Sequence, residues 1–573
     1  MCGIVAGLGP AAAVRDAFAA ADPLAILARR GPDGAGVATV ELPGGRLLVL
    51  GQTRLAVVDR RTLPLPFRFR GTGGLLLAYN GEVYNAPSLR AELSDGLPWE
   101  TDCDAEVVAR AWRRWGPGCL ERLNGMFAFA LYDPGDEVYQ ARLFLARDRA
   151  GEKPLYWTLH GGALFVASEI KALPVPLVEG PCPELDAFEF DCGRSTPFRG
   201  VFSLPPATCA LVDVAEDPPT VCDRPWWCLP DPAEDTGEAP AGIARAEAVR
   251  DLADLVADAV RIRLPSEVPL AVLLSGGLDS AIIQAVARAE HVYCATFPAH
   301  IDNAGDALLC TFGGELHGVT FGLDNVLADL DRVAYTCDTP ATWTAVALHY
   351  LYKAMRADGH VVALSGEGAD EAFWGYSRYR ALWHIDRLEA DPVLRGYAPL
   401  KAHLLGGREA DLLGRLLCRG TSADARLTTR EIAGRLGIVG QSLVANMARI
   451  DWHTTMQVLL RMADRAAGAV GMENRSPFLD VRVVEAAAAL HPGLKIDERN
   501  TKAILRDVAT RLGVPAAVAY STTKRGLAIP WGAWTGAVGP RGTWDRSSFA
   551  EAMHHAWRTA FGLAERPAAV YAA

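Results

Sequence analysis

The distribution of apolar residues along the chain divides it into two parts with different periodicities. Before residue 214, short apolar runs alternate with turns rich in Gly, Asn and Asp, which predicts a largely antiparallel sheet system. The predicted strands are 2–8, 46–50, 75–79, 126–132, 143–146 and 163–167. Few helices are expected between them, one of them near 104–115.

After residue 241 the pattern changes to alternating helices and strands. Val249, Leu252, Val256 and Val260 recur at helical spacing and mark one apolar helix face. The short apolar runs 270–274, 291–297 and 360–364 are typical of buried parallel strands, and 279–289 is predicted to be a helix. This alternation predicts a doubly wound α/β domain, with a mostly helical region over 376–493.

The segment between the two parts, residues 214–241, is acidic and rich in proline, and it shows no apolar period. Such a composition is typical of a linker. The predicted organisation is therefore a first domain over 1–213, a linker over 214–241 and a second domain over 242–573.

Composition narrows the functional classes. The net charge of −11 argues against a general nucleic-acid binder, which needs a basic surface. No apolar run of 18 residues is present, so we expect no membrane span, and the N-terminus does not resemble a signal peptide. The twelve cysteines match no zinc or iron–sulfur spacing, which favours reduced thiols in a cytoplasmic protein.

Cys2 is the first candidate for chemistry. If Met1 is removed, Cys2 carries a thiol and a free α-amine on one residue. The pKa of an α-amine is close to 8, so a fraction is neutral and can accept the thiol proton. This is the arrangement of an N-terminal nucleophile. Alone, Cys2 could equally be a cysteine that merely begins a buried strand.

Several motifs accompany Cys2 in a fixed order: Arg30-Gly31-Pro32-Asp33, Arg54–Asp59, Asn80–Asn85, Asp104-Ala105-Glu106, Asn124–Ala128, Ala146-Arg147-Asp148, Lys153–Tyr156 and Ser168-Glu169. Residues 2–205 thereby resemble the glutaminase domain of class II glutamine amidotransferases. The resemblance implies an α+β Ntn-type αββα sandwich in which Cys2 attacks L-glutamine. It also implies the oxyanion donors and glutamine-binding residues, which are Asn80, Gly81, Arg54, Val57, Glu82 and Asp104.

The second half carries an anion-binding pattern. Ser275-Gly276-Gly277-Leu278-Asp279-Ser280 follows an apolar strand and opens a helix, where backbone N–H groups can approach an anion. An ordinary glycine turn would look similar. The string resembles the pyrophosphate loop of ATP-pyrophosphatase (PP-loop) domains, and Asp279 would then help to hold Mg²⁺. The ATP-binding residues that this implies are Leu274, Ser275, Gly276, Gly277, Asp279, Ser280, Ala295, Ser365 and Gly366.

The segment Ser365–Glu371 resembles the signature of asparagine synthetases, with Asp370 as the second Mg²⁺ carboxylate. Glu367 stands where related β-lactam-forming synthetases carry Tyr, which favours external ammonia over ring closure. Lys524 is expected to reach the acyl-adenylate and its pyrophosphate leaving group. Further matches are Asp464-Arg465, Glu473–Asp480 and Lys502–Arg506.

Nearly the whole chain thus resembles the asparagine synthetase B-like family. The resemblance implies a ligase that releases ammonia from glutamine at Cys2 and activates a carboxylic acid with ATP and Mg²⁺ at the second site. The products are an amide, AMP and pyrophosphate. A non-catalytic homologue and a β-lactam or macrolactam cyclase are the alternatives. A substituted glutamine as donor and the oligomeric state, including a homodimer, are left open.

The acceptor acid is predicted from departures from the family pattern. An Asp-Glu pair of the family is replaced by Gly305-Asp306, and its Ser-Met and His are replaced by Ala467-Gly468 and Val470. Smaller and less polar side chains predict a roomier pocket and an acceptor larger than aspartate, such as a natural-product acid. The alternative is neutral drift in an enzyme that makes asparagine from aspartate.

Overall fold

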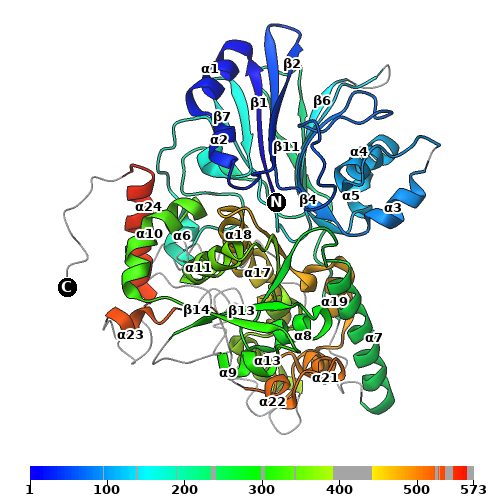
Figure 1. Ribbon diagram of the computed structural model, residues 1–573, viewed down its shortest axis with the longest axis vertical. Helices are drawn as coiled ribbons and strands as arrows, with labels where there is room; N and C mark the ends of the chain where they lie inside the picture. The colour runs from blue at the N-terminus through cyan, green and yellow to red at the C-terminus, as the bar shows by residue number, and fades with distance from the viewer. Residues whose placement is uncertain are drawn as a thin grey trace.

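Two domains follow one another along the long axis of the molecule, and the N-terminus of the chain lies between them (Figure 1). The computed structural model describes residues 1–94, 96–136, 140–188, 190–233, 241–297, 304–340, 343–390, 442–522, 527, 529–535 and 546–563. Lys524 lies outside these residues.

The first domain contains two sheets that face each other. One has six strands in the order β2-β3-β1-β8-β7-β9, and the other has five in the order β11-β10-β6-β5-β4. The strands are β1 (Cys2–Pro10), β2 (Gly34–Leu42), β3 (Arg46–Arg54), β4 (Leu76–Val83), β5 (Gly125–Asp133), β6 (Arg142–Arg147), β7 (Tyr156–His160), β8 (Ala163–Ala167), β9 (Val201–Ser203), β10 (Thr208–Asp213) and β11 (Cys222–Pro225). All pairings within these sheets are antiparallel, as predicted.

Alternation along β1 explains the layering of this domain. Ile4, Ala6 and Leu8 point into an apolar layer shared with the second sheet, whereas Val5 joins the cluster under the helices. On the outside, α1 (Ala11–Ala21) and α2 (Pro23–Leu27) cover the first sheet. The second sheet is covered by α3 (Ala86–Glu92), α4 (Asp104–Trp115) and α5 (Cys119–Arg122). The predicted αββα sandwich is therefore confirmed.

The second domain is built on a parallel sheet in the order β14-β13-β12-β15-β16. Its strands are β12 (Leu270–Leu273), β13 (His291–Thr296), β14 (Glu315–Thr320), β15 (Val362–Leu364) and β16 (Glu473–Arg475). One face packs on α7 (Gly242–Arg261), α8 (Leu278–Ala287) and α21 (Ala503–Arg511). The other packs on α10 (Leu323–Cys337), α11 (Trp343–Ala357) and α18 (Thr455–Gly468), so the sheet is doubly wound as predicted.

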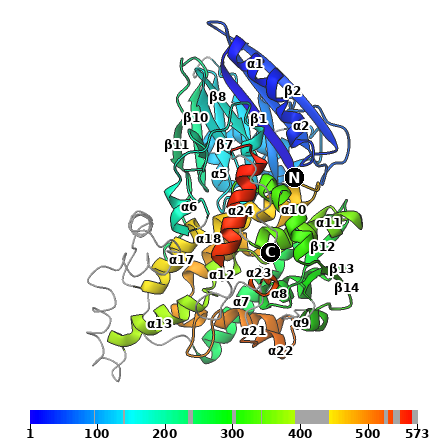
Figure 2. The ribbon, with the colours of Figure 1, turned by 90° about the vertical axis from the view of Figure 1, so that its left-hand side faces the viewer.

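The remaining helices surround this core, and α24 runs beside α10 in both views (Figures 1 and 2). They are α6 (Pro183–Phe188), α9 (Ala304–Leu309), α12 (Ala369–Ala372), α13 (Ser377–Ala390), α17 (Leu443–His453), α19 (Val481–Ala489), α20 (Pro492–Lys495), α22 (Ala516–Ala519), α23 (Trp531–Thr535) and α24 (Arg546–Ala560). Among the helices of the described residues, none combines the length and the apolarity that crossing a bilayer requires.

The start of the predicted linker differs from the structure. Strand β11 lies inside the segment 214–241, yet it pairs with β10 at the edge of the second sheet. Polar and proline residues are tolerated there because an edge strand is hydrogen-bonded on one side only. The first domain thus continues to Pro225. Strands β2, β7, β9 and β14 were also not among the predicted elements.

Candidate active sites

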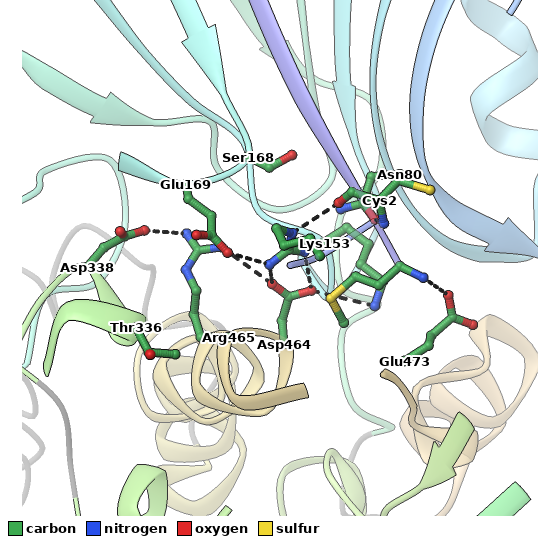
Figure 3. Close-up of polar contacts among 12 residues, drawn as sticks. Cys2, Asn80, Lys153, Ser168, Glu169, Thr336, Asp338, Asp464, Arg465 and Glu473 are labelled. Atoms are coloured by element: carbon green, nitrogen blue, oxygen red, sulfur yellow. Dashed lines mark hydrogen bonds and ion pairs between the residues drawn. The ribbon is translucent and has the colours of Figure 1, made fainter. Parts of the chain in front are cut away.

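Cys2 lies at the boundary between the domains, at the first position of β1. It pairs with Arg54 across the sheet, and its backbone N–H donates to Asn80 Oδ1 at 2.8 Å. The ammonium group of Met1 lies 2.9 Å from Glu473 Oε2, a residue of the second domain (Figure 3). Burial raises the pKa of the Cys2 thiol, although the nearby N-terminal ammonium opposes this effect.

A pocket beside Cys2 is lined by all the residues that were predicted to hold glutamine except Asn80. Its lining includes Cys2, Arg54, Val57, Gly81, Glu82 and Asp104 from the first domain, together with Glu473. The guanidinium group of Arg54 donates to the carbonyl oxygens of Arg61 and Val58 at 2.8 and 3.1 Å. These contacts wrap residues 55–61 around the Arg54 side chain, so the loop that carries Val57 is held at the rim of the pocket.

Two buried carboxylates share one side of this pocket. Asp104 Oδ2 accepts hydrogen bonds from Tyr79 Oη at 2.6 Å and from the Val83 N–H at 2.9 Å. Burial raises the pKa of Asp104, and burial together with the Asp104 charge raises the pKa of Glu82. Arg475 approaches Glu82 to 3.3 Å. A ligand ammonium would relieve the repulsion between the two carboxylates.

Asn80, which contacts the Cys2 backbone, has an unused donor. Its side-chain oxygen is occupied by Cys2, while Nδ2 is buried and has no hydrogen-bond partner among the described residues. An unpaired buried N–H carries a desolvation cost of about 1–3 kcal/mol. Its neighbour Gly81 lies so close to the Met126 carbonyl oxygen that no side chain fits there. Asn80 Nδ2 is therefore a buried donor that is available to a ligand.

The second candidate site lies at the carboxyl end of β12. The strand ends at Leu273, and Ser275–Gly277 turn into α8, with Gly276 at a φ of +74° that favours glycine. The Ser275 N–H donates to Ser280 Oγ at 3.2 Å, which closes the turn. A pocket there is lined by Ser275, Gly276, Gly277, Asp279, Asp370, Lys502 and Arg506, among others.

The loop that follows β15 contacts this turn directly. A Cβ atom on Gly366 would lie 2.9 Å from Asp279 Cβ, so only glycine allows this approach. Ser365 and Gly366 thereby stand against the turn without belonging to the pocket lining described above. Leu274 and Ala295 are buried within the sheet region, and the Leu274 N–H donates to the Tyr293 carbonyl oxygen at 2.9 Å.

Asp279 and Asp370 converge on a single cation. Lys502 Nζ lies 2.7 Å from Asp279 Oδ2 and 2.8 Å from Asp370 Oδ1. Lys502 also adopts a left-handed φ of +53°, a strained conformation for a residue with a side chain. Two carboxylates that converge on one cation supply the oxygen donors that Mg²⁺ prefers.

Glu367 follows β15, in the loop that contacts the turn before α8. Burial raises the pKa of Glu367, an effect that hydrogen bonds from Ser365 and Asn474 oppose. Four buried polar atoms here have no hydrogen-bond partner among the described residues: Glu367 Oε2, Ser365 Oγ, Asn474 Oδ1 and Tyr352 Oη. Asn474 belongs to β16, directly after Glu473 in the first pocket, so this strand connects the two sites.

A buried network of charges joins the domains beside Cys2 (Figure 3). Arg30 Nη1 lies 2.8 Å from Glu169 Oε1 and 2.9 Å from Asp464 Oδ2. Arg465 continues the network to Asp338 at 2.8 Å. Burial alone would raise the pKa of Asp464, but the Arg30 and Lys153 charges lower it. The network thus fixes α18 against the first domain.

The positions that predicted an enlarged acceptor pocket lie against this network. A Cβ atom on Gly468 would be 2.8 Å from Arg30 Nη1 and 2.9 Å from Met1 Sδ. Ala467 is fully buried in the apolar cluster on the same helix end, and Val470 packs against that cluster. Gly468 thus lies against side chains of the first domain, and its small size leaves room for the side chains of Arg30 and Met1.

Two residues of these sites had no predicted role. Glu473 and Lys502 lie in segments that resemble the family, but their importance depends on contacts with Met1, Asp279 and Asp370, far away in the sequence. The sequence around Glu473 and around Lys502 does not indicate these contacts.

Comparison with known proteins assigns each half of the chain. Residues 251–559 match the family model described as asparagine synthase, and residues 1–227 match a glutamine amidotransferase domain model. A putative glutamine-hydrolyzing asparagine synthetase of Mycobacterium tuberculosis (strain ATCC 25618 / H37Rv) is 30% identical to this chain. The alignment covers 93% of this chain and 88% of the relative. Glutamine-hydrolyzing asparagine synthetase 1 of Bacillus subtilis (strain 168) is 27% identical, with 89% and 83% covered.

Proposed function

Because the chain belongs to the asparagine synthetase B-like family of glutamine-hydrolysing amide ligases, we propose that it transfers ammonia from L-glutamine to a carboxylic acid activated by ATP. The observation that carries this proposal is the pairing of a complete Cys2 pocket with the Asp279–Asp370 pocket in one chain. Glutamine and ATP are both cytoplasmic metabolites, so we expect the reaction to occur in the cytoplasm.

At the first site, we assign the nucleophile to Cys2 after removal of Met1. The freed α-amine accepts the thiol proton, and the thiolate attacks the side-chain amide of glutamine. Asn80 Nδ2, with the Gly81 N–H, donates to the oxyanion that forms. Arg54 pairs with the α-carboxylate and Asp104, with Glu82, pairs with the α-ammonium group of glutamine. Ammonia leaves, and water then hydrolyses the thioester.

At the second site, Ser275–Gly277 and the start of α8 bind the phosphates of ATP. Asp279 and Asp370 would hold Mg²⁺, which neutralises charge on the phosphates as the acyl-adenylate forms. Lys502 then moves off these carboxylates toward the phosphates. Lys524 assists the departing pyrophosphate in this proposal. Glu367 lies where ammonia would arrive from the first domain.

We propose aspartate as the acceptor, which makes the product asparagine. The contacts of Gly468 with Met1 and Arg30 account for one family departure without a larger pocket, and the full-length relatives are named as asparagine synthetases. The second candidate is a larger, partly apolar acid. It is favoured by Gly305-Asp306, which stands in place of an acidic pair of the family.

The decisive experiment measures AMP, pyrophosphate and amide formation with ATP, glutamine or ammonia, and a panel of acids. For aspartate, we expect a kcat/KM at or above about 10⁴ M⁻¹s⁻¹ with saturating ATP and ammonia. Turnover of a larger acid with aspartate at least about a hundredfold poorer would establish the second candidate instead. Absence of pyrophosphate release with every acid would contradict both.

A further inference from the structure

A cluster of histidines lies at the amino end of the parallel sheet in the second domain. This is the end opposite the Ser275–Gly277 turn. His291 is the first residue of β13, and Glu315 and His317 lie at the start of β14. Since the strands are parallel, all three residues stand at the amino end of the sheet, whereas Ser275–Gly277 follow the carboxyl end of β12.

Strand register places these side chains on one face. His291 is the partner of Glu315, and Tyr293 is the partner of His317. Residues two apart in a strand point to the same side, so Glu315 and His317 share the face that His291 occupies on the neighbouring strand. The arrangement therefore follows from the sheet itself and not from flexible loop positions.

We infer that His291, Glu315 and His317 form a binding site for one zinc ion. His291 Nδ1 lies 3.0 Å from His317 Nε2, and Glu315 Oε2 lies 3.9 Å and 4.0 Å from these two nitrogens. A point equidistant from three atoms with these separations is about 2.1 Å from each of them, which is the length of zinc–nitrogen and zinc–oxygen bonds.

The contact between the two imidazoles fits this inference. Without metal, one ring nitrogen must carry a proton and donate to the other. When zinc binds, that proton moves to the opposite nitrogen of its ring, and both facing nitrogens become ligands. The carboxylate of Glu315 supplies a negative charge that offsets part of the charge of the ion.

The rings of His360 and Tyr293 pack against the two histidines of the cluster. The ring of His360 lies 5.0 Å from that of His291, and its Nδ1 is buried without a hydrogen-bond partner among the described residues. Tyr293 stacks on His317 at 4.6 Å and donates to Asp358 at 2.6 Å. His317 is thereby held in place.

The donor set distinguishes this site from the predicted Mg²⁺ site. Two imidazoles and one carboxylate suit Zn²⁺, whereas Mg²⁺ prefers oxygen ligands alone. The site would also have a structural consequence. Strand β14 is the edge of the sheet and pairs only with β13 among the described strands. Zinc would connect the two strands through side chains and protect this edge from opening.

The test uses the full-length protein with Cys222→Ser and Cys228→Ser, because these two exposed thiols could bind zinc themselves. After treatment with a chelator, the protein is titrated with Zn²⁺ against a chromophoric competitor in excess Mg²⁺. We expect one ion per chain with a Kd at or below about 10 µM and a raised Tm. Co²⁺ should give the visible absorption of a low-coordinate nitrogen–oxygen site.

The variant His291→Ala/His317→Ala should lose this binding by more than about 100-fold, since even residues behind a ligand contribute roughly 10- to 100-fold. Glu315→Gln should weaken it while leaving the fold intact. His160→Ala/His384→Ala, which removes two exposed histidines elsewhere, should bind like the parent protein. Equal zinc affinity in all variants, or no binding by the parent protein, would overturn the inference.

Discussion

The two polar atoms of the Asn80 side chain differ in their contacts, one being used by the fold and the other being available for chemistry. Its oxygen holds the start of β1 through the Cys2 N–H, and its buried nitrogen is left for a ligand. In the proposed mechanism, the same side chain positions the nucleophile and stabilises the charge that attack on an amide would generate. This double use makes Asn80 the most informative residue to change in the first site.

Replacing Asn80 by Ala should lower kcat for glutamine hydrolysis by about 10²- to 10³-fold, the loss typical of one oxyanion donor. Ammonia-dependent amide synthesis should be unaffected, because the second site does not use this side chain. Steady-state assays with each nitrogen source measure both effects. A parallel loss with ammonia would mean that the variant damages the fold.

Replacing Cys2 by Ala should abolish amide formation from glutamine and leave synthesis from ammonia unchanged. The reason is that only the thiol can form the proposed thioester. The exposed Cys222→Ala variant is the matched control and should behave like the wild type. Glutamine use by Cys2→Ala at the wild-type rate would exclude Cys2 as the nucleophile.

Replacing Asp279 or Asp370 by Asn should remove amide formation with either nitrogen source. Each change deletes a carboxylate proposed to hold Mg²⁺ and leaves Lys502 with one partner. Glutamine hydrolysis should persist. Asp324→Asn, an exposed change in the first turn of α10, serves as the control. The readout is ATP–pyrophosphate exchange, and wild-type exchange in both variants would contradict the assignment.

Among the elements, β16 links the two sites although it has only three residues. Glu473 lies in the pocket beside Cys2, Asn474 hydrogen-bonds Glu367, and Arg475 reaches Glu82. Burial alone would raise the pKa of Glu473, but the N-terminal ammonium group and Arg475 lower it to about 2. The charge on this strand is thus part of what holds the domains together.

The lowered pKa of Glu473 predicts an acid-dependent loss of stability. A carboxyl group with a folded pKa near 2 stabilises the fold fully above its unfolded pKa near 4.5, and this contribution disappears as the pH falls toward 2. In protein that retains Met1, wild type and Glu473→Gln should therefore differ most in unfolding free energy at neutral pH, by up to about 3 kcal/mol, and converge as the pH falls toward 2. Denaturant unfolding across this pH range measures the difference, and a gap that widens in acid would refute the assignment.

The local sequence pattern was sufficient to predict most helices and strands and most residues of the first pocket. Helix α4 and strand β8 have the predicted bounds, and Cys2, Arg54, Val57, Glu82 and Asp104 lie together as the resemblance implied. Strands β2 and β14 were missed because both are edge strands with half-exposed residues, so no apolar run marks them. The contact of Gly468 with Arg30 was not predicted, because Arg30 lies over 400 positions earlier and local sequence contains no information about it.

For the whole molecule, the two domains should act as one unit because their charges are shared. Arg30 and Asp464 are almost fully buried at the interface, so replacement of Asp464 leaves Arg30 with Glu169 as its remaining carboxylate partner and upsets the balance of buried charge. Asp464→Asn should lower the amount of amide formed per glutamine hydrolysed, while ammonia-dependent synthesis is retained. Arg15→Gln, which breaks an exposed ion pair with Glu41, is the control. An unchanged ratio of amide to hydrolysed glutamine would argue against coupling through this pair.

The enclosure of the Met1 ammonium group by Glu473 has a practical consequence for producing this protein. Any purification tag fused ahead of Met1 would have to pass through the closed interface between the domains, and it would also prevent the exposure of the Cys2 amine. Such a preparation should behave as an ammonia-only synthetase, however well it folds. Expression designs should therefore place the tag after Ala573 or use a cleavable leader that leaves Cys2 as the first residue.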